Sequence, residues 1–154
     1  MEPCHEPVPM VAAIHIAPGA RLPVRSVARV VAEAGKGLVG DRYHGTRQRH
    51  VSVQSLEQLA QGAELLGRPI DPAGTRRNIT LSRGLVPTRP GARITLGQVQ
   101  LEVVRLAAPC RLLDDNLGAG AAEALRRRAG AICRVLVGGE IAVGDRVGLH
   151  EGGE

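Results

Sequence analysis

The chain has 154 residues, which is the length of one domain that can bury a sizeable core. Its hydrophobic content of 44% is ordinary, but aromatic residues make up only 1% and Tyr43 is the sole member. A core of Leu, Val, Ile and Ala is therefore expected. Proteins that bind single-stranded nucleic acid by stacking bases on aromatic rings are disfavoured, so nucleic acid is an improbable partner.

The formal charge of +5 comes almost entirely from arginine, because Lys36 is the only lysine. Guanidinium groups suit phosphate and carboxylate ligands, although a high-GC coding bias would produce the same skew. A pyridoxal phosphate enzyme would need Lys36 as its Schiff-base lysine. Its place between Gly35 and Gly37 in a loop makes it a poor candidate.

The three cysteines, Cys4, Cys110 and Cys133, have spacings that match no zinc site, iron–sulfur site or disulfide framework. The N-terminal stretch lacks a basic segment ahead of an apolar one, so no signal peptide is expected. No run of about 18 apolar residues is present, so no membrane partner is expected. These features together predict a reduced, cytoplasmic protein.

The first third of the chain predicts strands separated by turns. Strands are expected over residues 10–16 and 24–34. The segment AGKGLVGDRYHG, residues 34–45, holds four glycines, which indicates positive φ or close backbone approach. It does not match a P-loop. The polar groups this loop would present are Asp41, Arg42 and His44.

A short strand over 51–53 should lead directly into a helix. Ser55 followed by Gln58 is a capping-box pattern, and Gly67 with Pro69 ends the segment. Apolar residues at helical spacing predict the buried face of this helix. They are Leu56, Leu59, Ala60, Ala63 and Leu66. A further strand is predicted to begin near Arg77, with Arg76 and Arg77 placed as either ordinary surface charge or ligand contacts.

The rest of the chain is predicted to be mostly β. Hairpins are expected around Gly97-Gln98 and around Gly138-Gly139, and a turn at Gly144-Asp145 precedes a last strand over 146–149. Residues 118–128 predict a short amphipathic helix with a basic end. Short strands, turns and two helices indicate a mainly β protein, a closed or partly open β-barrel or a sandwich, as a single domain. Its core would span about 24–147, with loose termini at 1–9 and 150–154.

The stretch LEVVRLAAPCRLLDDN, residues 101–116, places a thiol where a strand ends. Pro109 cannot donate to a strand ladder, so the strand should stop before it. Cys110 then lies between Arg105 and Arg111, and nearby positive charge favours the reactive thiolate. The alternative is that Cys110 is a small buried hydrophobic residue like most free cysteines.

Four segments in this order, GLVGDR at 37–42, RRNI at 76–79, APC at 108–110 and GGEIAVGDRV at 138–147, resemble the MOSC domain family. This is the C-terminal domain of molybdenum cofactor sulfurase, and it also exists as stand-alone bacterial proteins. The likeness runs from about Val24 to Val147. It implies a β-barrel core of the pyruvate-kinase-barrel-like type and a cytoplasmic protein that handles molybdopterin.

The resemblance also implies roles for particular residues. Cys110 would be the catalytic residue, as a sulfur carrier or as the ligand to molybdenum. Cofactor contacts would come from three segments, with Asp114 or Asp115 as the acidic residue after the cysteine. The candidates for binding the cofactor are Asp41, Arg42, Arg76, Asn78, Arg111 and Asp114. Arginines would hold the phosphate by forked, charge-assisted bonds, and they would lower the thiol pKa of Cys110.

Three functions stay open at this point. The chain could bind the molybdenum cofactor or accept sulfur on Cys110 from a donor protein. It could instead be a molybdoenzyme that reduces N-hydroxylated compounds with electrons from an outside partner, because no cysteine cluster could hold an iron–sulfur centre. The third possibility is a basic interaction domain that binds RNA or an acidic protein. The pyridoxal phosphate domain of the sulfurase has no counterpart here.

Overall fold

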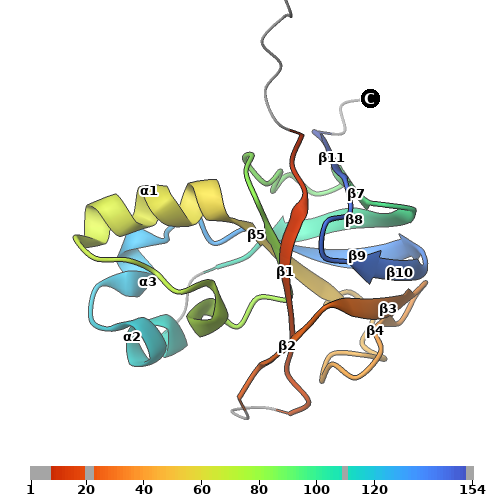
Figure 1. The fold of residues 1–154 in the computed structure, drawn as a ribbon, viewed down its shortest axis with the longest axis horizontal. Coiled ribbons are helices and arrows are strands. Elements are labelled where there is room, and N and C mark those ends of the chain that lie inside the picture. The colour runs from red at the N-terminus through yellow and green to blue at the C-terminus, as the bar shows by residue number, and fades with distance from the viewer. Residues whose placement is uncertain (1–7, 20–22, 109–110, 152–154) are drawn as a thin grey trace, which may run out of the picture.

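A computed structural model describes residues 8–19, 23–108 and 111–151, and the side chains of residues 111 and 112 are not described. It is a mainly β protein in which strands occupy one side and helices the other (Figure 1). The strands of the larger sheet are β1 (Val11–Ile16), β2 (Arg25–Val27), β5 (Val51–Ser55), β6 (Ile79–Leu81), β7 (Arg93–Leu96), β8 (Val99–Leu106), β9 (Ala131–Val137) and β11 (Val147–His150).

A smaller sheet of three strands covers part of the larger one. It contains β3 (Arg29–Glu33), β4 (Gly37–Leu38) and β10 (Gly139–Ala142), in the order β10-β3-β4. The strand predicted over 24–34 is thus two strands, because the chain bends at Ala28 and passes from one sheet to the other. The predicted hairpin around Gly138-Gly139 is wrong, since β10 pairs with β3 instead of β9.

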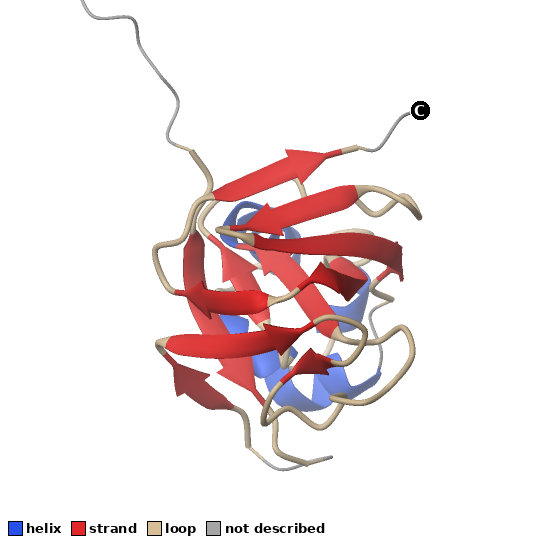
Figure 2. Cartoon of the chain, turned by 90° about the vertical axis from the view of Figure 1, so that its right-hand side faces the viewer, coloured by secondary structure: helices blue, strands red, loops and turns tan. Residues whose placement is uncertain are grey.

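The larger sheet runs in the order β11-β7-β8-β9-β5-β6-β1-β2 and curls around an aliphatic core (Figure 2). The described strands do not close into a regular barrel. One isolated bridge, Met10 to Arg146, connects the beginning of β1 to the residue before β11. The predicted β-rich fold is therefore confirmed, whereas its closure as a barrel is not.

Three helices and one 3-10 turn form the other side of the molecule, not the two helices predicted. They are α1 (Leu56–Leu66), η1 (Pro72–Thr75), α2 (Arg111–Leu117) and α3 (Ala121–Ala124). Ser55 caps α1 as predicted, accepting a hydrogen bond from the Gln58 backbone N–H at 3.1 Å. The helix predicted over 118–128 is shorter: α3 begins after Gly120, whose φ of 93° is left-handed, and its C-cap residue is Leu125.

The buried face of α1 differs from the pattern predicted for it. Gln58, Leu59 and Gly62 are buried, whereas Leu56 is exposed. A Cβ on Gly62 would lie 2.8 Å from a methyl carbon of Leu125, so the absence of a side chain lets α1 approach α3 closely. Behind these helices a second apolar cluster forms. It contains Leu59, Ile70, Ala107, Leu113, Ala121, Leu125, Ala129 and Ile132.

β5 and β6 are parallel neighbours, and α1 with η1 makes the connection between them. Ser55 ends β5 directly at the first turn of α1, so the C-terminal end of this strand is covered. The opposite ends of β5 and β6 meet the end of the antiparallel strand β1. This meeting of three strand ends is where the candidate site lies.

Candidate functional site

A cavity of about 200 Å³ opens where β1 ends and β5 and β6 begin. We call it the arginine cavity. It is lined by Ala17, Asp41, Arg42, Tyr43, Arg49, Ser52, Thr75, Arg76, Arg77, Asn78 and Leu113. The structure thus brings together Asp41, Arg42, Arg76 and Asn78, which come from two of the sequence segments singled out above.

Asn78 connects the backbone segments around this cavity by hydrogen bonds. Its side-chain oxygen accepts from the Ser52 backbone N–H at 2.9 Å and from the Ser52 hydroxyl at 3.1 Å. Its amide nitrogen donates to the His15 carbonyl at 3.1 Å and to Asp41 Oδ1 at 3.2 Å. Both amide protons and both acceptor lone pairs of Asn78 are therefore engaged inside the protein.

Asp41 fixes the glycine-rich loop to the sheet. Its Oδ1 accepts from the Ala17 backbone N–H at 2.9 Å as well as from Asn78, and Oδ2 accepts from the Tyr43 N–H at 3.3 Å. The Asp41 side chain is buried at 6% exposure. Because its oxygens point to these donors, Asp41 orients the loop and gives the cavity one buried negative charge.

The glycines of this loop make its path possible, as the sequence predicted. Gly35, Gly37, Gly40 and Gly45 all have positive φ. A Cβ on Gly37 would lie 3.2 Å from His50, against which the loop packs. His50 is itself fixed: its Nδ1 accepts from the Val135 N–H at 2.9 Å, so Nε2 is the nitrogen that donates to the Thr46 carbonyl at 2.7 Å.

Two arginines flank the single aromatic ring. The guanidinium carbons of Arg42 and Arg49 each lie 4.4 Å from the centroid of Tyr43, a cation–π distance, and Arg42 also contacts the Tyr43 hydroxyl. A ring with two guanidinium groups restricts the orientation of both. Tyr43 therefore positions cations at one side of the cavity instead of offering a platform to a base.

Arg76 and Arg77 line the cavity immediately before β6. Arg76 ends η1 in a left-handed conformation with φ of 62°, which is uncommon for a residue with a side chain. Its guanidinium donates to the Gly19 carbonyl at 3.4 Å, and that of Arg77 donates to the Ala108 carbonyl at 3.5 Å. Both contacts are long, at the outer limit of hydrogen bonding.

The cavity is strongly positive. In the part of the chain that the structure describes, four guanidinium groups and one carboxylate, that of Asp41, line it. Like charges repel more strongly where water is partly excluded, and an anion bound among them would relieve that repulsion. Chemically, the arrangement is suited to hold a phosphate or another small anion by forked, charge-assisted hydrogen bonds.

The remaining predicted site residues lie elsewhere or outside the described residues. Asp114 does not line the cavity: its Oδ1 accepts from the Ala122 N–H at 2.9 Å and so ties α2 to α3. Cys110 and the side chain of Arg111 lie outside the described residues. Among the described residues nearby in sequence, Leu113 lines the cavity and the Ala108 carbonyl accepts from Arg77.

Sequence reasoning missed Arg49, Tyr43 and Ser52 as parts of the site. Arg49 stands in a run of alternating Arg, Gln and His with no recognisable spacing, and only the fold brings it to Tyr43. Ser52 could have been found only from strand pairing, which sets it beside Asn78. Within the described residues, no group of three or more His, Cys, Asp and Glu side chains could hold a metal ion.

Cys133 is the one described cysteine, and it is fully buried in β9. Burial raises the pKa of its thiol to about 12, so it stays protonated and unreactive at neutral pH. No helix within the described part of the chain has the length and apolar content needed to cross a membrane.

Solved structures with this fold have little sequence in common with the chain. The YuaD protein of Bacillus subtilis superimposes with a TM-score of 0.80 at 19% identity, covering 93% of this chain and 96% of its own. YiiM of Geobacillus stearothermophilus gives 0.69 at 18%, with 92% and 74% covered. YiiM of Escherichia coli gives 0.68 at 16%, with 93% and 70% covered.

No curated protein sequence matches the chain. The MOSC domain, in contrast, matches over residues 40–148, which include the loop from Asp41, the arginines before β6 and the last strands. This match spans well over half of the sequence. The chain therefore belongs to the MOSC domain family.

Proposed function

We propose that the arginine cavity binds the phosphate of the molybdenum cofactor, and that Cys110 carries sulfur or ligates the metal. The observation that carries this proposal is the set of four guanidinium groups around one cavity of about 200 Å³, where the only carboxylate among the described lining residues, that of Asp41, accepts from other donors. Forked guanidinium donors match the oxygens of a phosphate.

The donor set of the described residues fits one part of this cofactor. Arg42, Arg49, Arg76 and Arg77 would hold the anionic phosphate end. When bound, the cofactor would supply redox chemistry at its molybdenum. The described residues contribute no ready cluster of metal ligands, so the proposal assigns the thiol role to Cys110 and leaves the phosphate to the arginines.

Within this proposal Asn78 and Asp41 act as positioning residues. Asn78 has its amide fully engaged with Ser52, His15 and Asp41, and it keeps the ends of β1, β5 and β6 in register. Asp41 holds the loop that carries Arg42. Arginine side chains are long and flexible, and these fixed backbone positions make their charges converge.

The metal and pterin content of the purified protein tests the first part of the proposal, that the cavity binds the cofactor (the binding arm). The chain is produced in a bacterial host that makes the cofactor, and molybdenum and pterin are measured per chain. We expect Arg76→Leu and Arg49→Leu each to lower both contents about tenfold, because each removes a charge-assisted contact. Arg93→Leu is the matched control, because Arg93 is an exposed residue of β7 and two strands, β8 and β9, separate β7 from β5. A wild-type protein without pterin contradicts the binding arm.

Mass spectrometry after incubation with a cysteine desulfurase tests the sulfur arm. We expect one added sulfur atom on the wild-type chain and none on Cys110→Ser. Cys133→Ser should still accept sulfur, since Cys133 is buried and stays protonated. Sulfur that persists on Cys110→Ser would contradict the assignment. Reduction of N-hydroxylated compounds by the pterin-loaded protein, with a supplied electron donor, would favour the enzyme over the carrier.

A further inference from the structure

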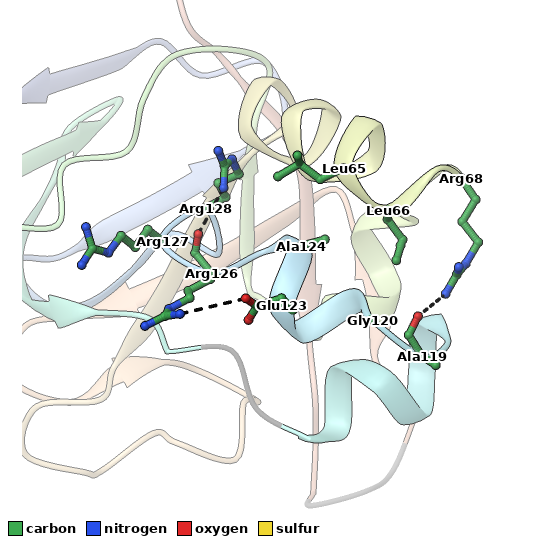
Figure 3. A pocket seen from close by; sticks show the side chains of 10 residues that line it. All are labelled: Leu65, Leu66, Arg68, Ala119, Gly120, Glu123, Ala124, Arg126, Arg127 and Arg128. Carbon is green, nitrogen blue, oxygen red and sulfur yellow. Dashed lines mark hydrogen bonds and ion pairs between the residues drawn. The ribbon is translucent and has the colours of Figure 1, made fainter.

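A second, larger hollow lies on the helical side of the molecule. It is an open groove of about 910 Å³ between the last turn of α1 and α3 with the turn that follows it (Figure 3). We call it the leucine groove. Leu65, Leu66 and Ala124 supply its apolar surface, and none of its described lining residues also lines the arginine cavity.

Leu65 is the outstanding apolar residue of this groove. It is 65% exposed, the largest value among the exposed large hydrophobic side chains described. The neighbouring Leu66 is half-buried and packs against the cluster beneath the helices. An exposed leucine beside a groove that already contains a second leucine offers apolar area to an outside partner.

Cations stand at both ends of the apolar surface. At one end Arg68 donates to the carbonyls of Leu117 at 3.2 Å and Ala119 at 3.0 Å, which fixes its guanidinium at the rim. At the other end is the run of Arg126, Arg127 and Arg128. All three line the groove, and in Figure 3 the Arg126 side chain points toward Glu123.

The charges in the groove are poorly neutralised by the protein. Among the described residues that line it, Glu123 is the only one with a carboxylate, and its oxygen lies 4.0 Å from Arg126 with both side chains well exposed. The buried Nε of Arg128 has no hydrogen-bond partner among the described residues. Within this turn Arg127 has a left-handed φ of 65°, which is uncommon for a residue with a side chain.

From this pattern we propose that the leucine groove binds an acidic, amphipathic helix of a partner protein. Leucines at helical spacing on that helix would cover Leu65 and Leu66, and its carboxylates would face Arg68, Arg126 and Arg128. Charge complementarity selects this occupant: an RNA strand would find no aromatic residue in the groove for base stacking, and its phosphates would face an apolar floor. This proposal is independent of what the arginine cavity binds.

Selection from a random peptide library tests the proposal. Phage displaying 16-residue peptides (about 24 Å as a helix) are selected on the full chain, and recovered clones are screened again on Leu65→Asp. We expect enriched peptides with leucines three or four residues apart and several acidic residues. A synthetic peptide from this set should gain helical circular dichroism on binding.

Matched variants then measure how the peptide is held. Fluorescence anisotropy should show affinity about tenfold lower for Leu65→Asp and for Arg126→Glu. Glu123→Gln should raise affinity by about twofold, because it removes the internal competitor for Arg126. Arg93→Glu and Arg76→Leu should leave the affinity unchanged, since both lie outside the groove.

Three results would overturn the proposal. The first is a library that yields no peptide whose binding depends on Leu65. The second is an unchanged affinity in both Arg126→Glu and Glu123→Gln, which would remove the role of charge. The third is Leu65-dependent binding of single-stranded RNA or of vesicles rich in phosphatidylserine with no binding of the peptides, which would assign the groove to another class of partner.

Discussion

The arginine cavity and the leucine groove both gather arginines, but they hold them in different ways. The cavity is built on strand ends, and a buried network around Asn78 and Asp41 holds the strand ends and the loop that carries Arg42. The groove lies between helices, and its cations surround the exposed Leu65 with one exposed carboxylate nearby. A preorganised cluster of cations suits a small anion, whereas an open apolar floor with charged ends suits a protein surface.

Removal of the Asn78 side chain should lower the stability of the protein more than any other change that tests this comparison. Asn78→Ala leaves the Ser52 N–H and Asp41 Oδ1 without their amide partner in a buried site. Each unsatisfied buried group costs about 1–3 kcal/mol, so we expect the free energy of unfolding to fall by about 3 kcal/mol. Urea denaturation measures it.

Asn116→Ala is the matched control for that experiment. Asn116 is an exposed asparagine whose amide donates to the Gly74 carbonyl at 3.1 Å. We expect it to change the free energy of unfolding by no more than about 0.5 kcal/mol. Equal losses in the two variants would contradict the view that a buried network builds the arginine cavity.

The burial of the Cys133 thiol can be used to test how well the sheet behind the cavity excludes solvent. Its partner in the ladder is Val51, at the beginning of β5. Burial raises the pKa of the Cys133 thiol to about 12, so the folded state keeps the proton that the unfolded chain loses near pH 9. Stability from this group is full below pH 9 and is lost as the pH rises toward 12, by about 1 kcal/mol per pH unit.

Comparison with Cys133→Ala isolates this effect. Urea denaturation between pH 8 and pH 10.5 should show a steeper loss of stability in the wild-type chain than in the variant. In the same experiment, iodoacetamide at pH 8 should leave Cys133 unmodified in the folded protein. Rapid alkylation of Cys133 would mean that the sheet behind the arginine cavity opens readily to solvent, which would contradict a rigid cavity.

The parts of the molecule that the sequence predicted best are those set by local chemistry. Ser55 caps α1 through a hydrogen bond to a residue only three positions away, and the glycines of the 35–45 loop have their predicted positive φ. Strand partners are a different matter. The pairing of β10 with β3 joins residues more than 100 positions apart, and no local pattern favours it over a hairpin with β9.

The same contrast between local sequence patterns and long-range contacts explains which residues of the two sites could be predicted. Arg76 and Asn78 were predicted because they stand together in a motif, and the structure places them in one cavity with Asp41 and Arg42. Arg49 reaches this cavity only through tertiary structure. The sequence indicated the basic end of the 118–128 segment, but it did not indicate a groove there, because helical spacing placed Leu66 on the buried face of α1 and left Leu65 out.

His15 should give a smaller, pH-dependent effect in the frame of the cavity. It is buried at 8% exposure, and desolvation lowers its pKa although Asp71 opposes this shift. The folded state therefore favours neutral imidazole, and stability from His15 is full above pH 6.5 and is lost as the pH falls through its lowered pKa. Denaturation at pH 7 and pH 5 should show a smaller loss for His15→Gln than for the wild-type chain, whereas an identical loss would contradict the burial of a neutral ring.

Leu65→Asp should have the smallest effect on stability. Leu65 is 65% exposed, so its removal creates no cavity, and a carboxylate there remains solvated. We expect the free energy of unfolding to stay within about 0.5 kcal/mol of the wild-type value, even though the same change should weaken peptide binding about tenfold. Leu59→Asp, at a buried position of the same helix with 3% exposure, should instead unfold the helical layer. A large loss of unfolding free energy in Leu65→Asp would mean that Leu65 stabilises the fold. Leu65 would then not be a free binding surface, and the contrast between the arginine cavity and the leucine groove would be wrong.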